Sequence, residues 1–320
     1  MESNRQTKYE IIRLLGMFLI VLQHLNFYTF GGPKGINLEA FSSCFVQSFS
    51  LIGVNLFILI TGYFGTNYKI SKIISLLFQC AFCVIPISLI YIWLFDIKIN
   101  TFQDLFNYFW PLNYWYIVSY IGFLVFVPIL NSYFKQTQKG CLEKQLFTFY
   151  VFAIIFDWIL QDNASGLVGG YSVLWLIFMY LVGRYIRIYN IKIKNKHLSI
   201  CALSLMLLNA IFLLFHCMST RYTSPFIFIP SICIFVLISR QNISDSKILN
   251  YISGGCTMVY LLHLHPLVFQ DIKRFVVGFH ETNNIIEFNI YRLVVIFVIF
   301  IIAVCYDKIR LYIWNLIYKR

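Results

Sequence analysis

Residues 10–30 read EIIRLLGMFLIVLQHLNFYTF and form a long apolar stretch near the start of the chain. About 20 apolar residues, rising 1.5 Å each in a helix, cover the roughly 30 Å hydrocarbon core of a bilayer. We therefore predict that residues 10–30 cross a membrane as a helix. Arg13 and His24 lie inside it, although an ionisable side chain at membrane depth is costly and usually indicates function. Their separation of about three helical turns places them on nearly the same helix face.

The whole chain has the composition of a membrane protein. Of its 320 residues, 60% are hydrophobic and only 12% are charged, whereas a soluble domain is about 25% charged. We predict an all-α membrane protein that forms one polytopic domain over residues 1–320, with no appended soluble domain. The first stretch is too long for a signal-peptide core and lacks a small-residue cleavage site, so it is expected to be retained.

Nine more apolar stretches follow the first, which predicts a bundle of about ten transmembrane helices. If both termini are cytoplasmic, 19 of the 25 basic residues fall on the cytoplasmic side, as the positive-inside rule requires. Topology thus explains most of the net charge of +12, and no nucleic-acid partner is needed. The predicted spans are 10–30, 44–65, 73–95, 114–131, 145–160, 171–189, 198–217, 225–239, 249–270 and 290–306.

Several classes of protein are disfavoured by missing motifs. The chain has no phosphate-binding G-x-x-x-x-G-K-[ST] loop, no G-x-G-x-x-G, no G-x-S-x-G and no H-E-x-x-H, which argues against an ATP-driven pump, a dinucleotide enzyme and common hydrolases. Most of the nine cysteines lie in apolar runs, where free thiols behave as small hydrophobes. We therefore expect neither disulfides nor a metal site.

Arg13 and His24 are the strongest catalytic candidates. Each has a simpler explanation: His24 as a histidine hydrogen-bonded to a neighbour, and Arg13 as a side chain that snorkels to the interface. In the functional hypothesis, Arg13 attracts an anion at the cytoplasmic mouth, and neutral His24 acts as general base toward a hydroxyl. Glu10, one turn before Arg13, is placed to pair with it.

Other polar residues suggest where two substrates would bind. Lys69 and Lys72, after the second span, are either ordinary positive-inside charges or, with Arg13, a phosphate-binding cluster for the donor. Asp157, near the outer end of the fifth span, is either a solvated helix-end charge or a group that orients a histidine or binds a sugar hydroxyl. Trp115 is either an interfacial belt residue or a platform for a sugar ring.

The ninth span ends in Tyr260-Leu-Leu-His263-Leu-His265-Pro266. Histidines two residues apart do not share a helix face, so they are not expected to form a helical metal site. One of the two is expected to face the interior of the bundle.

Five short motifs occur in order along nearly the whole chain, and together with ten spans they resemble the acyltransferase-3 family of integral membrane acyltransferases. Each motif is weak alone, whereas the ordered set is fairly specific. The motifs are Arg13-x10-His24, Gly53-Val-Asn-Leu-Phe57 with Thr61-Gly62-Tyr63, Trp115-Tyr-Ile-x-x-Tyr120, Pro128-x-x-Asn131 and Tyr260-Leu-Leu-His263.

The resemblance implies an O-acetyltransferase in the plasma (inner) membrane of a bacterium. It would move an acyl group, usually acetyl from acetyl-CoA, to a hydroxyl of a surface polysaccharide or lipid-linked sugar, without a metal. The family's functional arginine and histidine correspond to Arg13 and His24. His263 belongs to its late histidine motif and would either contact the acceptor or support the catalytic residues. The family's R-x-x-x-R donor motif is replaced here by Lys69-x-x-Lys72. The hydrolase-like domain of some members is expected to be absent.

Three alternatives remain open from the sequence. The chain could be a transporter or flippase of a lipid-linked saccharide in which His24 relays protons, an acyltransferase that acts on lipid, or a regulatory membrane domain derived from an acyltransferase. In the enzymatic hypotheses, His24 acts either directly as a base or through a transient acyl form.

Overall fold

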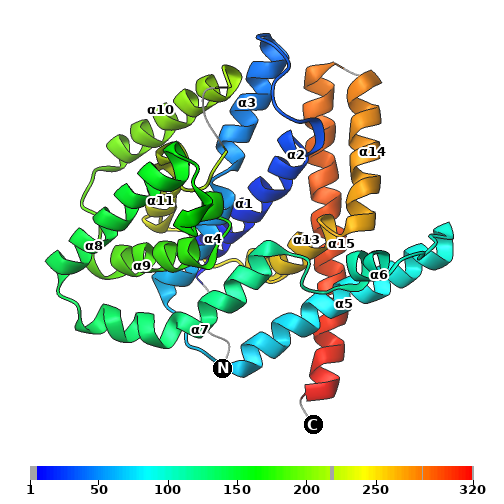
Figure 1. Cartoon of the computed structure of the whole chain (residues 1–320), viewed down its shortest axis with the longest axis horizontal. Coiled ribbons are helices and arrows are strands. Elements are labelled where there is room, and N and C mark those ends of the chain that lie inside the picture. Colours follow the sequence, from blue (N-terminus) through cyan, green and yellow to red (C-terminus); the bar gives the residue numbers. More distant parts are fainter. Residues whose placement is uncertain (1–5, 217–219, 283, 319–320) are drawn as a thin grey trace. The chain divides into compact units, whose positions relative to one another are not determined.

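The computed structural model describes residues 6–216, 220–282 and 284–318, and these residues form helices with no β-strand among them (Figure 1). They divide into two compact units. The first consists of the described residues up to Phe27, of Gly31–Tyr68 and of Trp115–Asp245. The second consists of Tyr28–Phe30, of Lys69–Tyr114 and of the described residues from Ser246 onward.

The first unit contains most of the predicted spans. Its helices are α1 (Thr7–His24), α3 (Leu38–Ser50), α4 (Gly53–Phe64), α7 (Trp115–Gln136), α8 (Lys139–Phe152), α9 (Val173–Tyr189), α10 (Asn195–Leu214) and α11 (Pro225–Ser239), with a π-helical turn at Ala153–Ile159 and 3₁₀ turns at Asn163–Ser165 and Val168–Gly170. The second unit contains α5 (Ile70–Phe95), α6 (Phe102–Phe109), α12 (Lys247–Ser253), α13 (Cys256–His263), α14 (Pro266–Thr282) and α15 (Ile285–Tyr318). The short helix α2 (Phe27–Phe30) is divided between the units: Phe27 belongs to the first and Tyr28–Phe30 to the second.

The chain is a multi-pass membrane protein. Among the described residues, six helical segments are long and apolar enough to cross a bilayer: Thr7–Phe30, Leu38–Phe64, Ile70–Phe95, Trp115–Gln136, Asn195–Leu214 and Ile285–Ile317. The other four predicted spans also overlap helices, namely α8 with its π-helical turn, α9, α11 and the run from α12 to α14. The total of ten spans and the cytoplasmic location of both termini stay predictions.

The ninth predicted span, 249–270, is not one continuous helix. The helices Lys247–His263 and Pro266–Thr282 meet at an angle of 84°. Pro266 explains the break, because its ring disfavours helical backbone at the preceding residue and because it has no N–H to continue the hydrogen-bond ladder. Proline is instead favoured in the first turn of a new helix, as it is here in α14.

Helix α4 packs closely against two neighbours in the first unit, α1 and α9 (Figure 1). A Cβ atom added to Gly53 would lie 2.6 Å from the carbonyl oxygen of Gly16 in α1. A Cβ atom on Gly62 would lie 2.3 Å from the carbonyl oxygen of Tyr180 in α9, and one on Gly183 would lie 2.6 Å from that of Leu59. Small residues thus bring these backbones together, as is common where membrane helices pack.

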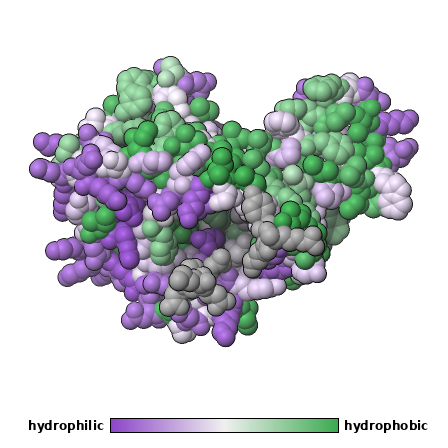
Figure 2. Space-filling model, turned by 90° about the horizontal axis from the view of Figure 1, so that it is seen from below, coloured by the Kyte–Doolittle hydropathy of each residue, from purple (hydrophilic) through white to green (hydrophobic). Residues whose placement is uncertain are grey.

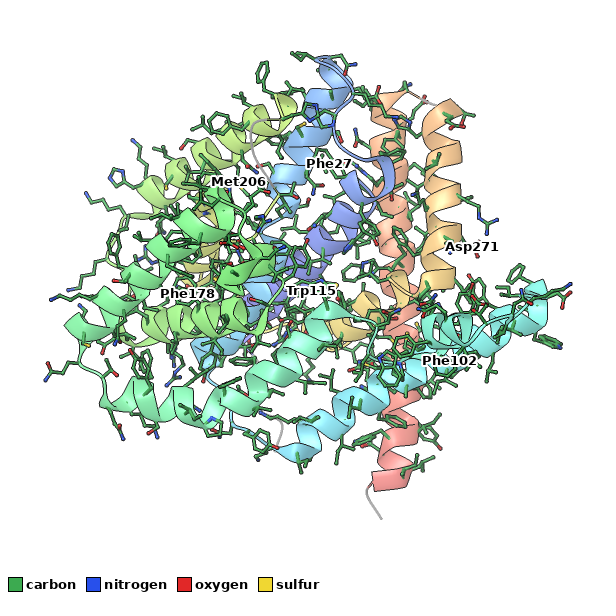
Figure 3. All side chains as sticks on the ribbon, viewed as in Figure 1. Phe27, Phe102, Trp115, Phe178, Met206 and Asp271 are labelled. Atoms are coloured by element: carbon green, nitrogen blue, oxygen red, sulfur yellow. The ribbon has the colours of Figure 1, made fainter. Side chains whose placement is uncertain are left out.

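Helices α3 and α10 are joined by both apolar and polar contacts. The Asn209 amide donates to the Ser48 hydroxyl over 3.0 Å, and that hydroxyl donates to the backbone carbonyl of Met206 over 2.7 Å. All of these groups are buried, and Figure 3 marks Met206 on α10. Hydrogen bonds between membrane helices add specificity to packing that apolar contact alone does not provide.

Hydrophilic residues gather on one face of the first unit. Figure 2 looks from below the view of Figure 1 and shows them over the side where α7, α8 and α9 lie. Lys135 at the end of α7 and Lys139 at the start of α8 are both exposed. Helix ends of this kind are expected outside the hydrocarbon core.

The glycine contacts of α4 predict a sharp difference between two substitutions. Gly62→Ala must separate α4 from α9, so it should lower the free energy of unfolding by about 1–3 kcal/mol, as overpacking does elsewhere. Gly140→Ala in α8 is the matched control, because a Cβ atom there meets nothing within 4 Å. Thermal unfolding of both purified variants in detergent measures the difference, and equal midpoints would contradict the close contact.

Candidate functional site

His24 is the last residue of α1 and is half-buried. Its ring forms a hydrogen bond with the backbone carbonyl of Ile20, one turn earlier in the same helix. A carbonyl can only accept, so one ring N–H is used in this bond, and the other nitrogen of a neutral ring carries a lone pair. The helix end therefore holds the imidazole in a tautomer that can accept a proton.

Beside His24, Gln23 connects the end of α1 to a group of aromatic rings. The Gln23 amide donates to the Tyr222 hydroxyl over 3.3 Å. The ring of Tyr222 lies 6.2 Å from that of Trp115 and 4.9 Å from that of Tyr171, while Trp115 and Tyr171 are 4.6 Å apart. We call Trp115, Tyr171 and Tyr222 the aromatic cluster; Figure 3 marks Trp115 at the start of α7. Tyr171 is 40% exposed, so the cluster has an accessible ring.

Helix α4 supports the aromatic cluster through Asn55. The Asn55 amide donates to the backbone carbonyl of Tyr222 over 3.3 Å, and its oxygen accepts from the Trp175 indole over 3.0 Å. Asn55 and Trp175 are fully buried. Asn55 belongs to the Gly53-Val-Asn-Leu-Phe57 motif, and its side chain fixes the segment that carries Tyr222.

Asp157 is fully buried, so it is not a solvated helix-end charge. It lies in the π-helical turn after α8 and accepts three hydrogen bonds, from the Gly169 amide at 2.8 Å, the Arg221 guanidinium at 2.9 Å and the Thr223 hydroxyl at 2.5 Å. Two of these donors flank Tyr222 in the sequence. Asp157 therefore positions the segment that holds the aromatic cluster, and its predicted contact with an acceptor stays a prediction.

Arg13 forms an ion pair with Glu10, which confirms the pairing expected from their spacing. The Arg13 side chain is partly exposed, whereas that of Glu10 is nearly buried. The positive charge of Arg13 also acts on the Tyr120 hydroxyl. That hydroxyl forms a side-chain hydrogen bond with Thr61. Helices α1, α4 and α7 thus bring a cation and two hydroxyl groups together, and all three residues come from the motifs that carry the family resemblance.

The remaining predicted site residues lie in the second unit. Lys69 and Lys72 are exposed at the start of α5, and their part in donor binding stays a prediction. Both His263 and His265 are buried, although only one of them was expected to face the interior. The Nδ1 atom of His263 lies 2.6 Å from the carbonyl oxygen of Val259.

His265 is held by the fold at the bend between α13 and α14. Its Nδ1 accepts from the Leu267 amide over 3.3 Å, and its Nε2 lies 3.2 Å from the Ser88 hydroxyl of α5. Both ring nitrogens therefore have partners, as expected of a structural histidine.

Sequence patterns did not single out Gln23, Tyr171 or Tyr222. Gln23 lies one position before His24, and Tyr222 lies in a connector between two spans, next to an arginine. These positions were the only features of the sequence that could have pointed to Gln23 and Tyr222 as site residues. The described cysteines are free thiols. Within the part of the chain that the structure describes, no three His, Cys, Asp or Glu side chains come together as metal ligands, and a metal-free site stays a prediction.

A family model described as an acyltransferase domain matches residues 7–307 of the chain. The matched range begins with α1 and runs into α15, so it includes every residue of the site described above. No curated protein and no solved structure matches the chain.

The three hydrogen bonds of Asp157 predict a stability effect. Asp157→Asn replaces one acceptor oxygen by an NH₂ group that faces donors, and it removes the charge that pairs with Arg221. The free energy of unfolding should fall by about 1–3 kcal/mol, the usual cost of a buried unsatisfied group. Asp162→Asn is the matched control, because Asp162 is exposed and asparagine caps a turn as well as aspartate does. Thermal unfolding checks this, and equal midpoints for the two variants would contradict it.

Proposed function

We propose, on the premise that the chain belongs to the acyltransferase-3 family of integral membrane acyltransferases, that it is an O-acetyltransferase of the cell envelope. The family match confirms the resemblance drawn from the motifs and makes the chain a multi-pass membrane acyltransferase. In our proposal the donor is acetyl-CoA, and the acceptor is a hydroxyl of a surface polysaccharide or a lipid-linked sugar. The enzyme would lie in the plasma (inner) membrane of a bacterium.

The observation that carries the proposal is the geometry of His24. The lone pair on its second ring nitrogen accepts the proton of the sugar hydroxyl as the hydroxyl oxygen attacks the thioester carbonyl carbon. A C–O bond forms, and the tetrahedral intermediate then expels the thiolate of CoA as the C–S bond breaks. Protonated His24 returns its proton to that sulfur, so the products are the acylated sugar and CoA. A transient acyl form of His24 is the alternative route to the same products.

Arg13 supplies positive charge on the same helix face, about three turns from His24. Glu10 orients the guanidinium, because the two form an ion pair within α1. In the proposed enzyme, Arg13 attracts the anionic groups of the donor toward the mouth of the site. Arginine suits this task because it is always charged and binds phosphate oxygens well.

The aromatic cluster is the proposed platform for the acceptor. Trp and Tyr rings present large apolar faces together with a polar tip, which matches the apolar face and hydroxyl rim of a sugar. Gln23 joins the cluster to the end of α1 that carries His24. In this proposal, a sugar ring stacked there lies at the same end of α1 as the proposed base.

Transfer of labelled acetyl groups from acetyl-CoA to purified glycan tests the proposal, with the enzyme reconstituted in vesicles. His24→Ala should lower the rate by about 10²–10⁴-fold, the usual contribution of a general base. His197→Ala is the matched control, because His197 is exposed in the first turn of α10. Full transfer by His24→Ala would contradict the role of His24. Movement of a lipid-linked saccharide by a wild-type protein without acetyl-CoA turnover would favour a transporter.

The aromatic cluster predicts a separate effect on the acceptor. Trp115→Ala and Tyr171→Ala should each raise the KM for the glycan by up to about tenfold, since aromatic contacts contribute about 0.5–1.5 kcal/mol. The KM for acetyl-CoA should not change. Trp93→Ala is the control, because this tryptophan of α5 is 81% exposed. Steady-state kinetics in the same vesicles measure both constants. An unchanged KM for the glycan would contradict the platform and favour an interfacial role for Trp115.

A further inference from the structure

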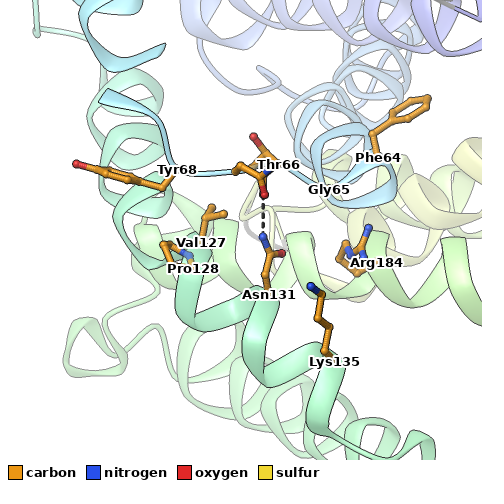
Figure 4. Close-up of a pocket in the computed structure, with 10 residues that line it drawn as sticks. Phe64, Gly65, Thr66, Tyr68, Val127, Pro128, Asn131, Lys135 and Arg184 are labelled. Carbon is orange, nitrogen blue, oxygen red and sulfur yellow. Dashed lines mark hydrogen bonds between the residues drawn. The ribbon is translucent and has the colours of Figure 1, made fainter. Parts of the chain in front are cut away.

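A polar pocket of about 550 Å³ opens at the C-terminal end of α4, inside the first unit (Figure 4). The turn Phe64–Tyr68 forms one wall, and α7 and α9 form the others. This volume lies within the range of small-molecule sites, about 300–1,000 Å³. None of the residues assigned above to the acceptor or to His24 lines the pocket.

The pocket is positively charged. Lys135 from α7 and Arg184 from α9 line it together with neutral residues, and none of the lining residues is acidic. Among the described residues, neither cation forms an ion pair with a carboxylate. Figure 4 shows both side chains reaching into the pocket from neighbouring helices.

Arg184 is held in place but is not satisfied. Its guanidinium carbon lies 5.5 Å from the centre of the Phe134 ring, and a Cβ atom on Gly65 would lie 2.8 Å from its Nη1 atom. Its Nε atom is buried and has no hydrogen-bond partner among the residues that the structure describes. Leaving a charged donor buried and unsatisfied is unfavourable, so the hydrogen-bonding capacity of Arg184 is not used up by the described residues.

A fixed network of hydrogen bonds builds the pocket wall. The Asn131 amide donates to the carbonyl of Thr66 over 2.8 Å (dashed in Figure 4), and the Tyr180 hydroxyl donates to the Asn131 oxygen over 2.6 Å. The Thr66 amide donates in turn to the Tyr180 hydroxyl over 3.4 Å. The turn after α4, α7 and α9 are thereby tied together, and Asn131 comes from the Pro128-x-x-Asn131 motif.

We infer that this pocket binds a phosphate group through Lys135 and Arg184. Phosphate oxygens are strong acceptors that suit a guanidinium and an ammonium together, and a bound anion would remove the repulsion between two uncompensated cations. Asn67 and the exposed ring of Tyr68 at the rim suit a phosphate that is part of a nucleotide. One source is the nucleotide half of CoA, an assignment that rests on the proposed function; the other is an anionic phospholipid headgroup.

The predicted topology agrees with the nucleotide half of CoA as the source of the phosphate. The turn after α4, the end of α7 and Arg184 all belong to segments that positive-inside counting assigns to the cytoplasm, where acyl-CoA is made. The sequence suggested Lys69 and Lys72 for donor phosphates, whereas the pocket assigns this role to two other basic residues that had been counted only for topology.

Binding of CoA and of inorganic pyrophosphate to the full-length protein in detergent tests the inference. Lys135→Gln and Arg184→Gln should each weaken CoA binding by about tenfold or more, a loss of about 1.4 kcal/mol. Arg184→Lys, which keeps the charge but loses the planar fork, should fall between wild type and Arg184→Gln. Lys139→Gln is the matched control, because Lys139 follows Lys135 by four residues, is exposed, does not line the pocket and pairs with Glu143. Because Lys135 is exposed, its variant should fold even where that of Arg184 does not.

A second arm separates the two sources of phosphate. Thermal unfolding in nanodiscs with and without phosphatidylglycerol reports binding of a lipid headgroup. Loss of CoA binding alone assigns the pocket to the nucleotide, and loss of the stabilisation by phosphatidylglycerol alone assigns it to lipid. Variants that match wild type and Lys139→Gln in both arms would overturn the inference. His24→Ala should bind CoA normally, so a failure of the proposed acetyl transfer leaves this test unaffected.

Discussion

The close approach of α4 to α1 and α9 is the constraint on which the first unit depends. Lipid tails are as apolar as the side chains of these helices, so burial gives little reason for one helix to prefer another. Selectivity must then come from contacts at short range. Gly16 with Gly53, and Gly62 with Gly183, remove the side chains that would keep the backbones apart. Since α1 carries both Arg13 and His24, these contacts also fix the positions of the two residues that the proposed enzyme uses.

The two ends of α4 have different tasks. Near its first residue, Asn55 holds the segment of Tyr222 and so supports the aromatic cluster beside the His24 end of α1. After its last residue, the turn that follows forms a wall of the basic pocket, and Tyr9 at the other end of α1 packs on Phe64. A 12-residue helix is about 18 Å long. In the proposed enzyme, α4 therefore separates acceptor from donor while joining both to α1.

Sequence patterns predicted the features that depend on residues close together in the chain, and few of the contacts between distant residues. Hydropathy located the helices, and spacing of three residues predicted the pair of Arg13 with Glu10. The Gln23–Tyr222 contact joins residues 199 positions apart, and no short pattern contains it. For Asp157 the sequence left open a solvated charge at a helix end, because its hydrogen-bond donors come from two connectors that no short pattern contains. Arg184 looked like a topology signal for the same reason, since its pocket exists only once α4, α7 and α9 pack.

His24 and His263 show why residue type alone does not identify a base. Each is the last residue of its helix, and each bonds to the carbonyl four residues earlier, of Ile20 or Val259. This bond satisfies one ring nitrogen within the helix, so neither histidine needs a partner from another element for that atom in an apolar setting. Exposure separates them: His263 is only 1% exposed, whereas His24 is half-buried. A general base must reach the proton that it removes, and this is why the proposal assigns that role to His24 and not to His263.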